Sequence, residues 1–142
     1  MGYTHYWRGW VTLSDTFVAD VRTIIEHSGV TICGWDGEGV PEITNEEIRL
    51  NGSVIDDNDH ETFLLVDGVN HSSSFCKTAH KPYDVVVATI LLRAANINKG
   101  FKVRSDGDWE NEDWIAARDL YFMVFKEQAN RPDEVRLVAS NA

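Results

Sequence analysis

A chain of 142 residues suits one domain with its own hydrophobic core, and 43% hydrophobic residues with 11% aromatics argue against a disordered protein. Thirteen Lys and Arg against 23 Asp and Glu give a net charge of −10, so we expect no nucleic-acid polymer as a partner. The longest apolar run, residues 85–92, is too short to span a bilayer, and the first residues lack the basic and apolar regions of a signal peptide. We therefore expect a cytoplasmic protein with no membrane partner.

The first forty residues predict a strand, a helix and a second short strand. Residues 3–13 alternate aromatic and polar side chains, which is typical of a strand. Ser14 can cap a helix that ends at Gly29, because apolar residues recur at helical spacing between the two. Residues 31–35 predict a short strand, and the glycine-rich residues 34–39 predict a turn or loop.

The middle of the chain predicts an antiparallel strand pair followed by a long loop. Residues 47–53 and 62–66 read as strands, and the acidic residues 56–61 between them read as a solvated loop tip. Residues 68–83 then predict a loop that runs into the most apolar helix of the chain.

The second half of the chain predicts two helices. Asp84 can cap a helix through about Asn98 whose apolar side chains surround it almost completely, which is typical of a central, covered helix. Residues 101–104 predict a short strand, residues 111–128 a third helix, and residues 135–138 an edge strand. This order is not a repeated βαβ pattern, so we expect an α+β fold. An antiparallel or mixed sheet would pack with about three helices in a single domain of residues 1–142.

Residues 68–83 carry most of the functional signal, because they contain no acidic residue in a chain of net charge −10. They hold two lysines, several hydroxyls and two histidines next to a predicted helix N-terminus, where backbone N–H groups favour anions. The ligand-binding residues expected here are Lys77, Thr78, His80, Lys81 and Tyr83. The alternative is structural: Asp84 caps the helix, and the lysines are solvated loop charges.

The amino-terminal strand predicts the rest of the site. An aromatic face beside a cation could hold a planar ligand by stacking or by cation–π contact. The residues expected to contribute are Tyr3, His5, Tyr6 and Arg8, whereas Trp7 and Trp10 are expected to fill the core.

Two segments carry a resemblance. The start Met1-Gly2-Tyr3-Thr4-His5-Tyr6-Trp7 and the later Phe75-Cys76-Lys77-Thr78-Ala79-His80-Lys81-Pro82-Tyr83-Asp84 resemble a group of short, uncharacterised bacteriophage and microbial proteins. The resemblance covers about 17 residues and brings no established activity and no assigned site. It implies a stand-alone small protein encoded by a phage or microbe, and its two segments are expected to meet in space.

Three functions stay open at this point. The leading hypothesis is a binding protein for a small anionic ligand that carries an aromatic ring, such as a nucleotide. In a phage, the protein could sequester such a ligand or act as an accessory protein. The second is a small enzyme in which His5 or His80 acts as acid or base with Asp36 or Glu38. The third is a structural or interaction subunit, which exposed apolar surface would favour, and homo-oligomerisation is compatible with all three.

Cofactor and metal signatures are weak. No P-loop, dinucleotide-binding or zinc motif is present, and residues 106–117 fail the calcium-loop pattern. We therefore predict no cofactor and no metal site. Cys33 and Cys76 lack CxxC spacing and read as buried, reduced thiols, with one disulfide in a secreted protein as the alternative.

Overall fold

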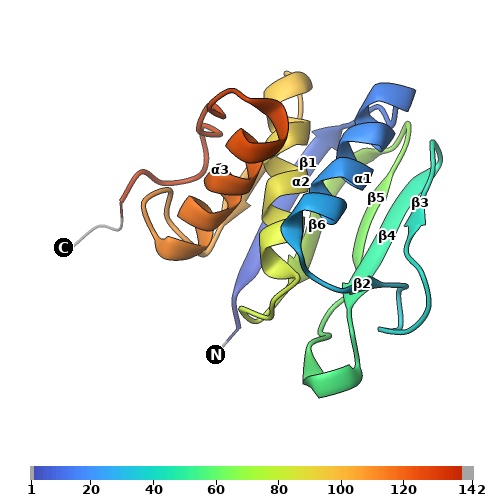
Figure 1. The fold of residues 1–142 in the computed structure, drawn as a ribbon. Coiled ribbons are helices and arrows are strands. Elements are labelled where there is room, and N and C mark those ends of the chain that lie inside the picture. Colours follow the sequence, from blue (N-terminus) through green and yellow to red (C-terminus); the bar gives the residue numbers. More distant parts are fainter. Residues whose placement is uncertain (1, 139–142) are drawn as a thin grey trace.

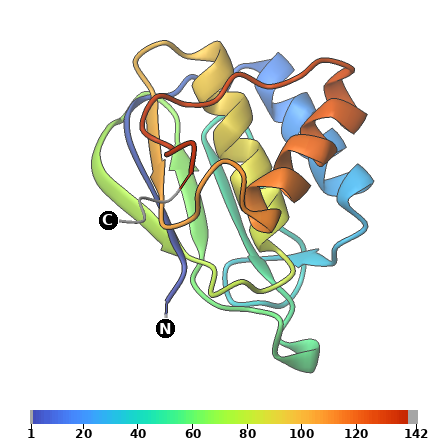
Figure 2. The same ribbon diagram turned by 90° about the vertical axis from the view of Figure 1, so that its left-hand side faces the viewer.

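The computed structural model describes residues 2–138 and has the predicted α+β fold. Three helices pack side by side, with α2 in the middle and the strands behind them (Figure 1). Turned by 90°, the strands form one layer and the helices the other (Figure 2). The helices are α1 (Asp15–Ser28), α2 (Asp84–Ile97) and α3 (Glu112–Phe125).

The strands form two antiparallel groups. In the first, β1 (Thr4–Trp10) lies between β6 (Asn70–Lys77) and β7 (Lys102–Ser105). In the second, β4 (Glu47–Gly52) pairs with β2 (Ile32–Cys33), β3 (Glu42–Ile43) and β5 (Phe63–Val66). A short 3-10 turn, η1 (Ile55–Asp57), lies in the acidic segment between β4 and β5.

Helix α1 follows the local rules of its sequence. The Ser14 hydroxyl accepts a hydrogen bond from the Phe17 backbone N–H at 3.1 Å, which satisfies one of the free donors of the first turn. Phe17, Val21 and Ile24 recur at helical spacing and are buried. Both predicted ends of the helix are confirmed, because it stops before Gly29.

Helix α2 is the centre of the core, as its apolar sequence predicted. Seven of its hydrophobic side chains are at most 1% exposed, since α1 and α3 flank it and β7 packs against it. Arg93 near its end joins the three helices: its guanidinium lies 3.0 Å from the Asp20 carboxylate of α1 and 2.9 Å from the Tyr121 hydroxyl of α3.

Two of the expected elements are wrong. Half of the expected loop at residues 68–83 is strand β6, and its pairing with β1 brings the two segments of the resemblance together, as expected. Residues 135–138 form bends and irregular backbone instead of an edge strand, and strand β3 was not expected. Asp84 begins α2 but caps no backbone N–H by its side chain, because its carboxylate binds His5 and Thr78 instead.

Candidate functional site

Strand β1 sends its side chains to two different environments. His5 and Trp7 point to the helices and are at most 3% exposed, whereas Tyr6 and Arg8 point to the other face of the sheet. All three helices pack on one side of the strands (Figure 2), so the outward side chains of β6, β1 and β7 line a face that no helix covers. We call this surface the open sheet face.

The strand register gathers rings and cations on the open sheet face. Tyr6 pairs with Phe75 of β6 on one side and with Arg104 of β7 on the other, so these three side chains form one row across the sheet. The Arg104 guanidinium carbon lies 4.3 Å from the centre of the Tyr6 ring, which is cation–π distance. In the next row Arg8 pairs with Lys102.

A bulge widens this second row. Trp7 pairs with Ser74, but Gly9 pairs with His71, so two residues of β6, Ser72 and Ser73, oppose the single residue Arg8. The result is a hollow of about 360 Å³ with hydroxyls along one side and cations along the other. Its lining residues are Tyr6, Trp7, Arg8, Ser72, Ser73, Ser74, Phe75, Lys102, Arg104 and Glu134.

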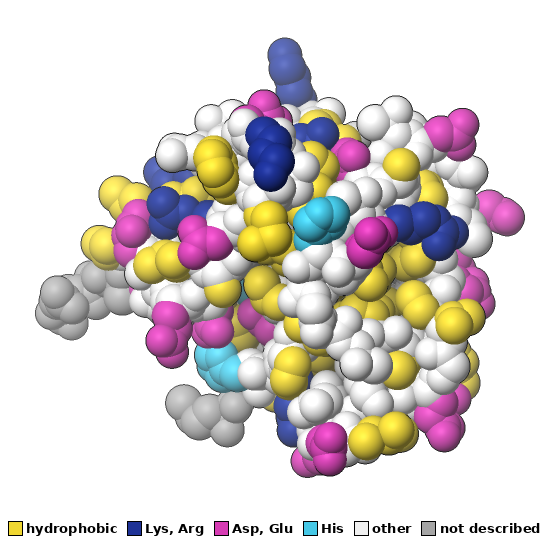
Figure 3. Space-filling view, viewed as in Figure 1, with side chains coloured by type: hydrophobic (Ala, Val, Ile, Leu, Met, Phe, Trp, Pro, Cys, Tyr) yellow, Lys and Arg dark blue, Asp and Glu magenta, His cyan; other side chains and the backbone are white. Residues whose placement is uncertain are grey.

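The open sheet face differs in charge from the rest of this acidic protein. Arg8, Lys102 and Arg104 line the hollow, and Glu134 is the one carboxylate among the lining residues that the structure describes. From the helix side, by contrast, acidic and basic side chains are scattered among hydrophobic ones (Figure 3). Cations concentrated over two rings favour an anionic group attached to a planar ring.

The inward side chains of β1 form a buried polar network instead. The His5 ring bonds through Nε2 to Asp84 Oδ1 at 2.7 Å and through Nδ1 to Ser105 Oγ at 2.9 Å. Thr78 donates its hydroxyl to the same Asp84 oxygen. His5, Asp84, Ser105 and Thr78 are all at most 6% exposed, so the network is closed to solvent.

Counting donors assigns the protons of this network. The Ser105 oxygen accepts hydrogen bonds from the Trp114 indole and from the Gly107 backbone, both at 3.0 Å. Both lone pairs are therefore used, and the Ser105 hydroxyl must donate to His5 Nδ1. His5 then carries its proton on Nε2 and donates it to Asp84, whose negative charge lies at the N-terminus of α2.

The Ser–His–Asp order resembles a hydrolytic triad, but its geometry is that of a structural network. A nucleophilic serine needs access to substrate, and Ser105 is 6% exposed with both acceptor positions filled from the protein. The network instead joins β1, β7, α2 and α3, because each of these elements supplies at least one member.

Tyr3 connects the buried network to the surface. Its ring lies edge-on to His5, at 5.1 Å between centroids, and stacks on His80 at 3.9 Å. The Tyr3 hydroxyl is buried and has no hydrogen-bond partner among residues 2–138, and burial together with the Asp84 charge raises its pKa. On its outer side His80 bonds to Asp113 at 2.9 Å.

The structure separates the nine residues expected to bind a ligand. Tyr6 and Arg8 line the hollow, and Lys77 lies near it on β6, with its amine 5.9 Å from the centre of the Phe75 ring. Lys81 lies in the turn before α2, outside the lining of the hollow, and its amine bonds to Asp57 of the acidic loop. The other five are not available to a ligand on this face. Tyr3, His5, Thr78 and Tyr83 are buried in the interior, and the His80 ring stacks on Tyr3.

The acid–base pairs of the enzyme hypothesis do not form. His5 bonds to Asp84 and His80 to Asp113, whereas Asp36 accepts a hydrogen bond from the backbone of Glu38 in its own turn.

The interaction-subunit hypothesis keeps one observation in its favour. On α3, Ile115, Phe122 and Met123 are between 39% and 51% exposed and lie beside a shallow hollow.

Sequence reasoning missed half of the open sheet face. Phe75, Lys102, Arg104 and Glu134 were not expected in a site. A local signal was present for two of them, since Lys102-Val103-Arg104 alternates cation, apolar residue and cation, as in a strand with one wet face. Phe75 and Glu134 carried no such signal, because their place depends on pairing with β1 and on the path of the C-terminal segment.

Both cysteines are buried and unpaired, which confirms the expectation of reduced thiols. Burial raises the pKa of Cys76 from 9.0 to about 12, and it raises the pKa of Tyr83 as well. An acid whose pKa is raised by folding loses its proton first in the unfolded chain. The stabilising effect is therefore complete below about pH 9 and is lost as the pH rises towards 12.

We accordingly expect the urea midpoint of unfolding to fall between about pH 7 and about pH 10.5. The variant Cys76→Ala removes one of the responsible groups, so its midpoint should fall less over the same range. A wild-type midpoint that stays constant across this range would contradict the assignment.

Within residues 2–138, none of the helices has the length and apolar content that a membrane span requires. Across the same part of the chain, no group of three or more His, Cys, Asp or Glu side chains is placed to hold a metal ion. No protein-family model, no curated protein and no solved structure matches this chain.

Proposed function

We propose that the protein binds a small anionic ligand carrying a planar ring, of nucleotide type, on the open sheet face. One observation carries the proposal: the register places Phe75, Tyr6 and Arg104 in one row and Arg8 and Lys102 in the next. The rings would accept the planar part of the ligand, and the cations would bind its phosphate or carboxylate.

The small size of the hollow favours a small ligand over a polymer. About 360 Å³ accommodates a ring with its attached group, and binding sites for small molecules start near this volume. The net charge of −10 would repel a long polyanion beyond the few contacts that the face offers. Ser72 and Ser73 along the hollow add hydroxyls that can donate to oxyanions or accept from ring amines.

Calorimetric titration of the protein with each of the four ribonucleoside monophosphates tests the proposal. We expect Arg104→Gln to weaken binding by about tenfold, because it removes one charge-assisted contact and the cation over Tyr6. We expect Tyr6→Leu to weaken it by about fivefold through lost stacking.

Two variants elsewhere serve as matched controls. Arg49→Gln removes the same charge from β4, where Arg49 pairs with Glu47, and Phe122→Leu removes an exposed ring from α3. Both should bind as the wild type does. The proposal fails if none of the nucleotides binds at millimolar concentration, or if the controls lose as much affinity as Arg104→Gln. Sedimentation at increasing protein concentration would separate the interaction-subunit alternative.

A further inference from the structure

The hollow of the open sheet face already contains an anion of the protein itself. The two carboxylate oxygens of Glu134 lie 2.5 and 2.6 Å from the two terminal nitrogens of Arg8. This is the bidentate geometry in which a guanidinium binds carboxylate or phosphate. Arg8, Lys102 and Arg104 together lower the pKa of Glu134, so its carboxylate lies where the positive charge of the face is concentrated.

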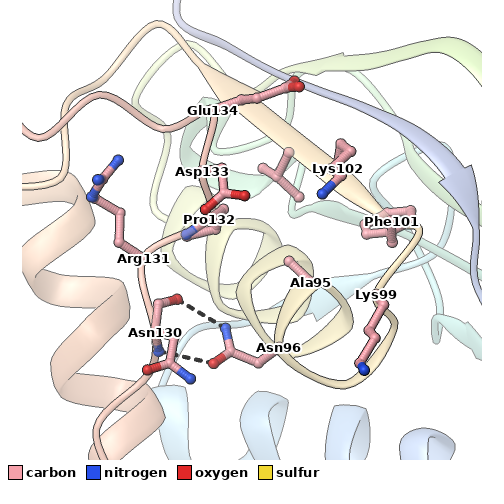
Figure 4. A pocket seen from close by; sticks show the side chains of 11 residues that line it. Ala95, Asn96, Lys99, Phe101, Lys102, Asn130, Arg131, Pro132, Asp133 and Glu134 are labelled. Atoms are coloured by element: carbon pink, nitrogen blue, oxygen red, sulfur yellow. Dashed lines mark hydrogen bonds between the residues drawn. The ribbon is translucent and has the colours of Figure 1, made fainter.

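The segment that carries Glu134 is attached to the protein on both sides of that residue. Before it, the Asn96 side chain accepts a hydrogen bond from the Asn130 backbone N–H at 2.8 Å and donates one to the Asn130 carbonyl at 3.1 Å (Figure 4). After it, the Val135 side chain is buried. Glu134 can therefore leave Arg8 by rotation of its own side chain, without detachment of the segment.

The pair itself is easily exchanged. The side chains of Arg8 and Glu134 are 53% and 33% exposed, and ion pairs so open to water are weak because solvent screens them. A ligand anion that contacts Arg8 together with Lys102 or Arg104, and whose ring stacks on Tyr6, has more partners than the Glu134 carboxylate has. Such an anion would displace it.

We infer that the Arg8 guanidinium is the oxyanion subsite of the ligand and that Glu134 is an intramolecular competitor that the ligand must displace. This rests on the proposed function and adds its specificity: the ligand presents a carboxylate or a phosphate that fits the guanidinium fork. Glu134 sets the affinity, because every bound ligand must first replace it.

Calorimetric titration of Glu134→Gln with adenosine 5′-monophosphate tests the inference, and adenosine 5′-carboxylate distinguishes the two oxyanions. We expect Glu134→Gln to bind the preferred probe about five- to tenfold more tightly than the wild type, since the competing charge is gone. Asp133→Asn is the matched control: it removes the same charge one residue away, from an exposed carboxylate outside the lining of the hollow. In the double variant Arg8→Gln/Glu134→Gln the gain should disappear.

The outcomes separate the two proposals. If the wild type binds and Glu134→Gln gains no more affinity than Asp133→Asn, the competitor role is overturned and the proposed function stands. If neither the wild type nor Glu134→Gln binds either probe, the proposed function and the inference both fall. Binding by Glu134→Gln alone would show that Glu134 blocks the Arg8 subsite, but it would overturn the proposed function of the wild-type protein.

Discussion

Asp84→Ala is expected to lower the free energy of unfolding by about 3 kcal/mol or more. The change leaves the His5 Nε2 proton and the Thr78 hydroxyl without their shared acceptor in a region closed to water. It also removes a negative charge from the N-terminus of α2. Urea unfolding followed by tryptophan fluorescence measures the loss, because Trp114 belongs to the same network.

Two variants make this prediction specific. Asp84→Asn keeps an oxygen that can accept from His5 and Thr78, so it should cost clearly less than alanine. Asp113→Ala breaks the exposed contact with His80 and should cost at most about 1 kcal/mol. If Asp84→Ala and Asp113→Ala are equally mild, the buried network does not stabilise the fold as we describe.

Gly9→Ala is expected to cost at least about 3 kcal/mol, and the variant is expected to be partly unfolded at room temperature. A Cβ at Gly9 would lie 2.0 Å from the backbone oxygen of Gly100, and Gly9 has a φ of +99°, which side chains rarely adopt. Neither strain can be relieved by a side-chain rotation, because the obstructing atoms belong to the backbone. Thermal unfolding by circular dichroism measures the effect.

Gly39→Ala separates the two causes. Gly39 has a φ of +66°, but a Cβ there would meet nothing within 4 Å, so this variant carries only the conformational cost of roughly 1 kcal/mol. Equal losses at both glycines would show that the close approach of Gly100 to β1 is unimportant. A larger loss at Gly9 would show that the close contact between Gly9 and Gly100 is important for the fold. That contact lies next to the pairing of Arg8 with Lys102, which forms one row of the open sheet face.

The parts of the fold that depend on residues close together in the sequence were predictable from the sequence. Ser14 and Gly29 define α1, and the continuous apolar surface of residues 85–97 identifies a central helix. Strand β6 was missed because its Asn, His and three serines favour turns locally. What makes it a strand is pairing with β1, whose residues lie 60 to 73 positions away in the sequence.

The site was predictable only in part, for the same reason. Tyr6 and Arg8 were identified because they lie on a recognisable strand. His5 and Asp84 were expected to serve a ligand and a helix cap, but they bond to each other across 79 positions of sequence. Glu134 could not be anticipated, because only the folded path of the C-terminal segment brings it to Arg8, 126 positions away.

The position of β1 affects how the chain reaches its native state. Strand β1 is the middle strand of its sheet and is synthesised before both of its partners, β6 and β7, the second of which ends at Ser105. Residues 4–10 must therefore wait on the ribosome until the chain has emerged as far as Ser105. Contacts so distant in sequence make folding slow relative to helical proteins of this size, and during that delay the aromatic residues of β1 are accessible to chaperones and to other nascent chains.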